Sequence, residues 1–131
     1  MASKEQKTAD MAHILVVDDS PTERHFISKL LEKTGHKVST AESGEEGIEA
    51  AKDTHPDLIL MDIVMPGMNG FQATRQITQA PETAEIPVVM VSTKSQQTDK
   101  VWATRQGAKG YLVKPVDSDM LVSSIKSFLA A

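Results

Sequence analysis

The sequence predicts an α/β fold in which a parallel five-stranded sheet is covered by helices on both faces. Three short runs of consecutive apolar residues, at 14–17, 58–61 and 88–91, have the length of strands. They lack the polar–apolar alternation of a half-exposed strand, so they are typical of strands buried on both faces. Helical patterns separate these runs. Strict alternation of strands and helices with short connections favours right-handed crossovers and a parallel sheet.

Two further strands complete the predicted sheet. Residues 36–41 (HKVSTA) alternate between polar and apolar types, which indicates an edge strand, and residues 111–113 form a short fifth strand. For five strands that are each followed by a helix, the common doubly wound order is 2-1-3-4-5. We therefore expect this (βα)5, flavodoxin-like arrangement. Ligands in such folds bind beyond the carboxyl ends of the strands, at the switch point between strands one and three.

Helix start signals lie between the predicted strands. The segments 20–23 (SPTE) and 43–46 (SGEE) each pair an N-cap serine with a glutamate three residues later, and 69–72 (NGFQ) is a weaker version. The fourth helix should cover about 96–106, and the last should begin near Asp117. The first helix should end at Gly35 and carry an apolar stripe formed by Phe26, Ile27, Leu30 and Leu31.

Length, charge and composition limit the possible functions. The 131 residues suit one domain, and we expect a flexible extension at 1–11 before a folded domain at 12–131. The net charge of −4 argues against a nucleic acid or an anionic membrane as partner. The sequence has no cysteine, which excludes disulfides and cysteine-ligated zinc. We see neither a signal peptide nor a membrane span, so we expect cytoplasmic residence.

Chemically active side chains follow the predicted strands at their carboxyl ends. Asp18 and Asp19 follow the first strand and Asp62 follows the third, its predicted neighbour. Three converging carboxylates need a compensating cation, and hard oxygen ligands suit Mg²⁺ or Mn²⁺. Ser92 and Lys114 follow the fourth and fifth strands and offer donors suited to phosphoryl oxygens. A carboxylate beside a divalent ion can attack phosphorus and form an acyl phosphate.

Longer segments around these residues resemble the receiver domains of response regulators of the CheY-like type. The matching segments are 16–20 (VVDDS), 56–70 (PDLILMDIVMPGMNG), 87–92 (PVVMVS) and 107–115 (GAKGYLVKP). The resemblance covers nearly the whole chain, from about residue 13 to residue 129, and its motifs are highly specific.

This resemblance implies a role for each residue at the strand ends. It implies a Mg²⁺ site formed by Asp18, Asp19, Asp62 and the backbone carbonyl of Val64. Asp62 would be the phosphoacceptor, and Ser92 and Lys114 would bind the phosphoryl group. Tyr111 would act with Ser92 as the switch, and the Lys114–Pro115 peptide bond would be cis.

The resemblance also implies partners. A histidine kinase would donate the phosphoryl group, and a downstream protein would bind the face formed by the fourth helix, the fifth strand and the last helix. Three shorter segments, at 18–23, 70–76 and 98–102, resemble the stand-alone receivers of type IV pilus twitching-motility chemosensory systems. In such a system the kinase would be CheA-like, and the receiver, a monomer or weak dimer, would either pass on the signal or act as a phosphate sink.

Alternative functions remain to be weighed against this one. A phosphatase with a carboxylate nucleophile needs a second Asp two residues after the nucleophile, where this sequence has Val64. A receiver that binds partners independently of phosphorylation stays open, although the intact set of strand-end residues counts against it. We therefore predict a phosphoacceptor with only intrinsic autophosphorylation and autodephosphorylation chemistry rather than an enzyme. For Trp102, core packing is favoured over a role as a partner anchor.

Overall fold

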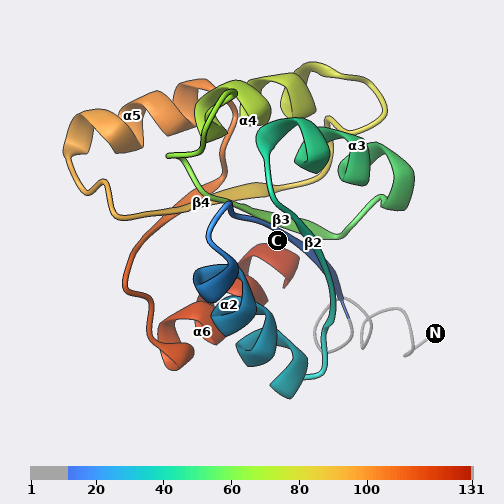
Figure 1. The fold of residues 1–131 in the computed structure, drawn as a ribbon, viewed down its shortest axis with the longest axis vertical. Coiled ribbons are helices and arrows are strands. Elements are labelled where there is room, and N and C mark those ends of the chain that lie inside the picture. Colours follow the sequence, from blue (N-terminus) through green and yellow to red (C-terminus); the bar gives the residue numbers. More distant parts are fainter. Residues whose placement is uncertain (1–11, 131) are drawn as a thin grey trace.

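The computed structural model describes residues 12–130 and contains five strands and five helices in strict alternation (Figure 1). The predicted extension at 1–11 lies outside the described residues. The elements are β1 (His13–Val17), α2 (Pro21–Lys33), β2 (Lys37–Ala41), α3 (Gly44–Thr54), β3 (Leu58–Met61), α4 (Gly70–Gln79), β4 (Val88–Ser92), α5 (Gln97–Arg105), β5 (Gly110–Val113) and α6 (Ser118–Ala130).

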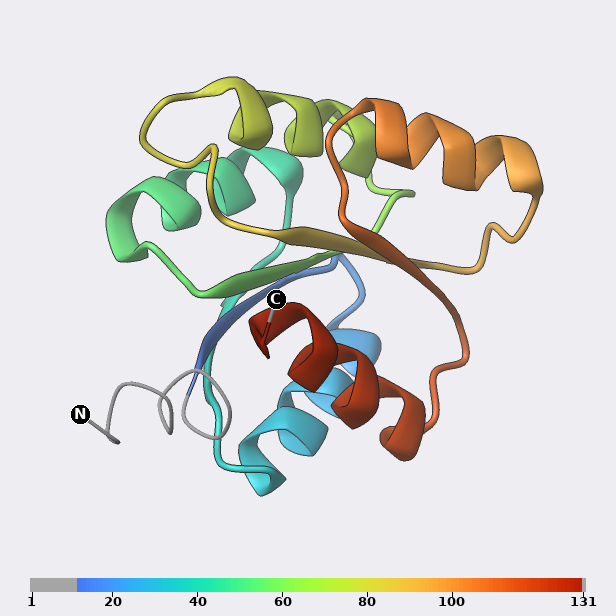
Figure 2. The same ribbon diagram turned by 180° about the vertical axis from the view of Figure 1, so that it is seen from behind.

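The strands form one parallel sheet in the order β2-β1-β3-β4-β5, so the predicted fold class is confirmed. Helices α2 and α6 cover one face of the sheet, and α3, α4 and α5 cover the other (Figures 1 and 2). The central strands β3 and β4 are buried at every position, as their unbroken apolar runs predicted. Within the described part of the chain, no helix has the length and apolar character needed to cross a membrane.

The core has one layer on each side of the sheet, and alternate residues of a strand enter different layers. Leu15 and Val17 of β1 pack in the layer under α3, α4 and α5, whereas Ile14 and Val16 pack in the layer under α2 and α6. Because the same strand contributes to both layers, β1 is held from both sides. This fixes the position of the residues that follow Val17.

Two aromatic side chains lie outside this core, contrary to expectation. Ile27 and Leu31 of α2 are buried, but Phe26 is 52% exposed. Residues 27 and 31 are one helical turn apart and share a face, which leaves position 26 at its margin. Trp102 is 48% exposed, and the buried residue of α5 is its neighbour Ala103. Trp102 is therefore only partly buried and does not belong to the core.

The helix starts agree with the prediction in position but differ in detail. Asn69 and Gln72 form the complete capping box, although their sequence signal was the weaker one. At Ser20 and Ser43 the serine hydroxyl accepts from the expected backbone N–H. In neither case does the glutamate three residues later complete the capping box with its carboxylate. The carboxylate of Glu23 instead pairs with a residue of the functional site.

Candidate functional site

Three carboxylates converge at the carboxyl edge of the sheet, as the strand order predicted. Val17 of β1 and Met61 of β3 are register partners, so Asp18 and Asp62 follow the two strands at the same level. Asp18, Asp19 and Asp62 each offer a carboxylate oxygen within 4.8 Å of the others. Asp18 and Asp62 are buried, whereas Asp19 is exposed, so the cluster reaches from the interior to solvent.

Asp18 is held rigidly by several hydrogen bonds. Its carboxylate Oδ1 accepts from the backbone N–H of Ser20 at 2.9 Å, and its own backbone N–H donates to the carbonyl of Ala41 at 3.1 Å. Arg24 donates from Nη1 to the Asp18 carbonyl at 2.7 Å. Sequence reasoning missed Arg24, because its partner is a backbone atom that no motif marks.

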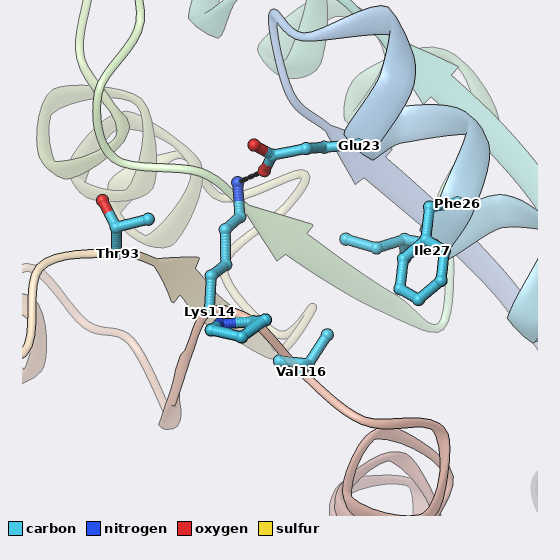
Figure 3. Close-up of a pocket in the computed structure, with 7 residues that line it drawn as sticks. Glu23, Phe26, Ile27, Thr93, Lys114 and Val116 are labelled. Carbon is cyan, nitrogen blue, oxygen red and sulfur yellow. Dashed lines mark hydrogen bonds and ion pairs between the residues drawn. The ribbon is translucent and has the colours of Figure 1, made fainter.

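Lys114 extends from the end of β5 into the carboxylate cluster. Its ammonium Nζ lies 3.0 Å from Asp18 Oδ2 and 3.6 Å from Asp62 Oδ1, and it also pairs with the carboxylate of Glu23 (Figure 3). Burial alone would lower the pKa of Lys114, but the hydrogen bonds to Glu23 and Asp18 and the charge of Asp62 outweigh burial and raise it. The Lys114–Pro115 bond is cis, as the resemblance implied.

The titration of the Asp62 carboxyl group is strongly perturbed. Burial raises its pKa from the ordinary 3.8 to about 6, and the charges of Asp18 and Asp19 add to this effect. The ammonium of Lys114 and the N–H of Ile63, which donates to Asp62 Oδ1 at 2.9 Å, oppose it. The pKa of Asp62 stays raised because burial, the largest of these effects, outweighs the attraction of Lys114.

This donor set fits a divalent cation. The three clustered groups are carboxylates, which are the hard oxygen ligands that Mg²⁺ prefers, and the exposure of Asp19 leaves room for the waters that Mg²⁺ retains. A bound cation would also favour the ionised form of Asp62, against the burial and the repulsion that raise its pKa. The side chain of Val64 is 58% exposed, and the role of its backbone carbonyl as a ligand stays a prediction.

The loop after Asp62 depends on a glycine whose importance the sequence did not reveal. The N–H of Gly70 donates to the carbonyl of Ile63 at 2.8 Å, which draws the start of α4 against the loop. A Cβ at position 70 would lie 2.0 Å from the carbonyl oxygen of Asp62. Only glycine allows this approach of two backbone segments. In the sequence, the signal for this glycine is its place directly after the N-cap Asn69, at the end of the segment 56–70.

Ser92 and Tyr111 meet the same short segment after β4. Ser92 is 1% exposed, and its Oγ accepts from the N–H of Lys94 at 3.2 Å. The hydroxyl of Tyr111 donates to the carbonyl of Lys94 at 2.8 Å. Burial, together with the charge of Asp99, raises the pKa of Tyr111.

Comparisons with known proteins show which family of proteins this chain resembles. A family model described as the response regulator receiver domain matches residues 14–126. The chain is 58% identical to Protein PilH of Pseudomonas aeruginosa over 120 residues, which span 92% of this chain and 99% of PilH. It is 40% identical to the chemotaxis protein CheY of Bacillus subtilis over 121 residues, or 91% and 99% of the two chains.

A solved structure of a receiver domain resembles this fold. It is the receiver domain of the sensor histidine kinase PA1611 from Pseudomonas aeruginosa, with a magnesium ion coordinated in its active site cleft. The TM-score is 0.85 at 26% identity, and the match covers 92% of this chain and 98% of the other.

Proposed function

Because the chain belongs to the response regulator receiver domain family, we propose that Asp62 accepts a phosphoryl group from the phosphohistidine of a partner histidine kinase. The observation that carries this proposal is the position of Asp62. Its carboxylate is buried at the end of β3, among two further carboxylates and 3.6 Å from the ammonium of Lys114. The two further carboxylates are ligands for a divalent cation, and that cation together with Lys114 would offset the negative charge that the product adds.

The transfer would be a displacement at phosphorus. A carboxylate oxygen of Asp62 attacks the phosphorus atom, the phosphorus–nitrogen bond to the histidine breaks, and its electron pair stays on the imidazole, which takes a proton from water. Because the pKa of Asp62 is about 6, its carboxyl group is ionised in most molecules at neutral pH, and the ionised form is the nucleophile. The product is an aspartyl phosphate that water later hydrolyses, so the chain is a phosphoacceptor with intrinsic chemistry rather than a classical enzyme.

The residues around Asp62 would together stabilise the negative charge of the phosphoryl group. Asp18, Asp19, Asp62 and the backbone carbonyl of Val64 would hold Mg²⁺, with Mn²⁺ as a substitute. A bound divalent ion neutralises charge on the reacting oxygens. Lys114 and Ser92 would bind the remaining phosphoryl oxygens, the first as a cation and the second as a hydroxyl donor.

Phosphorylation would change the face formed by α5, β5 and α6. If the Ser92 hydroxyl turns toward the phosphoryl group, it gives up the N–H of Lys94, and the segment that also binds Tyr111 is released. Val101 and Trp102 are exposed on α5, beside this segment, and supply apolar contacts for a downstream protein. Their exposure favours output to a protein target over a role as a phosphate sink alone.

We further propose that the signalling system is one that controls type IV pilus twitching motility. The support is the 58% identity to PilH over nearly the full length of both chains. A CheA-like kinase would then be the phosphodonor, and the receiver would act in the cytoplasm as a monomer or a weak dimer.

Labelling with acetyl phosphate tests the assignment of Asp62. The wild-type protein should acquire one phosphoryl group in the presence of Mg²⁺, and Asp62→Ala should acquire none. Asp53→Ala is the matched control, because Asp53 is an exposed carboxylate at the end of α3. Persistent labelling of Asp62→Ala would show that another residue is the phosphoacceptor. Phosphotransfer from candidate kinases, followed by capture of partners with the phosphorylated protein, would identify the system.

A further inference from the structure

The carboxylate of Glu23 pairs with Lys114 at the edge of the site, yet Glu23 is neither a predicted metal ligand nor a predicted phosphoryl-binding residue. We propose that Glu23 is a positioning residue that holds Lys114 back from Asp62 and thereby slows phosphorylation. This inference rests on the proposed function, since it concerns the regulation of the same site.

The distances around Lys114 support this role. Its Nζ is in contact with Glu23 Oε1 and lies 3.0 Å from Asp18 Oδ2, whereas Asp62 Oδ1 is farther away, at 3.6 Å. Figure 3 shows the lysine side chain directed toward Glu23 on α2. In the unphosphorylated protein, the ammonium is therefore held mainly by two carboxylates other than the phosphoacceptor.

The local structure of the helix start explains why Glu23 is available for this contact. In a closed capping box, the glutamate at this position accepts from the backbone N–H of the N-cap residue, here Ser20. That N–H instead donates to Asp18 Oδ1 at 2.9 Å. The backbone of Glu23 stays in place because its N–H donates to Ser20 Oγ at 3.3 Å. The carboxylate is thus displaced from the cap and pairs with Lys114.

The two carboxylates that hold Lys114 differ in their freedom to move. Asp18 is 2% exposed and its backbone is fixed by Arg24 and Ala41, whereas the side chain of Glu23 is 46% exposed. When Lys114 moves to bind phosphoryl oxygens, the contact with Glu23 is the one that must weaken. An ion pair with one exposed partner is weak, so its effect on the rate should be roughly two- to fivefold.

The first test compares labelling rates. With acetyl phosphate and saturating Mg²⁺, Glu23→Gln should be labelled roughly two- to fivefold faster than the wild type. Glu32→Gln is the matched control, since Glu32 is exposed near the other end of α2 and the variant has the same change in net charge. If Glu23→Gln and Glu32→Gln are labelled at the same rate as the wild type, Glu23 does not restrain Lys114. If the wild type itself is not labelled, the proposed function fails instead.

A second test separates the ion pair from a general charge effect. In a double-mutant cycle with Lys114→Gln, the acceleration by Glu23→Gln should disappear, because the group on which Glu23 acts is gone. An equal acceleration in both backgrounds would overturn the inference. An independent readout is the ¹⁵N resonance of the Lys114 ammonium in the metal-free, unphosphorylated protein. It should shift in Glu23→Gln and stay in place in Glu32→Gln, and an unchanged resonance in Glu23→Gln would also overturn the inference.

Discussion

The hydroxyl groups of Ser92 and Tyr111 are connected through the backbone of one residue, Lys94. Ser92 Oγ accepts from the Lys94 N–H at 3.2 Å, and Tyr111 donates to the Lys94 carbonyl at 2.8 Å. Ser92 is buried at the end of β4, whereas Tyr111 reaches the surface of β5. A change in the hydrogen bonding of the buried hydroxyl can thus reach the exposed face without passing through the core.

This connection predicts that Tyr111→Phe separates chemistry from signalling. The variant loses one hydrogen bond to the Lys94 carbonyl, which should lower the free energy of unfolding by about 1 kcal/mol or less. Labelling of Asp62 should proceed as in the wild type, since Tyr111 is not among the groups around the phosphoacceptor. The change in Trp102 fluorescence on phosphorylation should be smaller. A full fluorescence response in Tyr111→Phe would mean that the switch does not use this hydrogen bond.

Mg²⁺ should stabilise the folded protein through the carboxylate cluster. A ligand that binds only the folded state stabilises it by RT ln(1 + [L]/Kd), so the melting temperature should rise with the Mg²⁺ concentration. Asp19→Asn removes an exposed member of the cluster with little effect on packing, and it should weaken Mg²⁺ binding by about tenfold or more. Thermal unfolding over a Mg²⁺ titration measures this effect. Asp53→Asn, at an exposed site on α3, should behave like the wild type, and an identical titration for Asp19→Asn would exclude Asp19 as a ligand.

The raised pKa of Asp62 predicts the pH dependence of stability without metal. Because the folded state holds this proton up to a pKa of about 6 and the unfolded state only to 3.8, unfolding releases a proton between these values. Stability should therefore fall as the pH rises from about 4 to 6, by about 3 kcal/mol from this group alone.

Asp62→Asn lacks this titration and should be more stable than the wild type at neutral pH in EDTA, by up to about 3 kcal/mol. Urea denaturation of both proteins between about pH 4 and pH 7 measures the difference. The two proteins should converge near pH 4. A constant difference across this range would show that the pKa of Asp62 is not raised.

Gly70→Ala should displace the backbone around Asp62, although Gly70 itself is not a ligand or a phosphoryl-binding residue. The added Cβ would meet the Asp62 carbonyl oxygen at 2.0 Å, so the backbone of the loop or of α4 must move. We expect a loss of about 1–3 kcal/mol in unfolding free energy and slower labelling of Asp62. Gly44→Ala is a milder comparison, because its Cβ would lie 3.1 Å from the Met68 side chain and 3.2 Å from the Met68 carbonyl oxygen, and both should be smaller obstacles than a contact at 2.0 Å. Gly70→Ala with unchanged stability and labelling would contradict this account of the loop.

The sequence by itself determined the topology of the sheet and the members of the carboxylate cluster. Unbroken apolar runs mark strands buried on both faces, and their alternation with helices allows few arrangements other than 2-1-3-4-5. In that order β1 and β3 are neighbours, so residues that follow them must meet. For this reason Asp18, Asp19 and Asp62 could be assigned to one site although more than forty residues separate the first pair from the third.

The tertiary structure alone decided how the other groups lie around that cluster. The local sequence around Glu23 indicates only a capping box. The contact between α2 and the end of β5 shows that the Glu23 carboxylate pairs with Lys114, 91 residues later. The exposure of Phe26 and Trp102 depends on which side chains of other elements cover each helix face. The need for glycine at position 70 depends on the approach of a backbone segment. These are contacts between distant parts of the chain, and local patterns of residues carry no information about them.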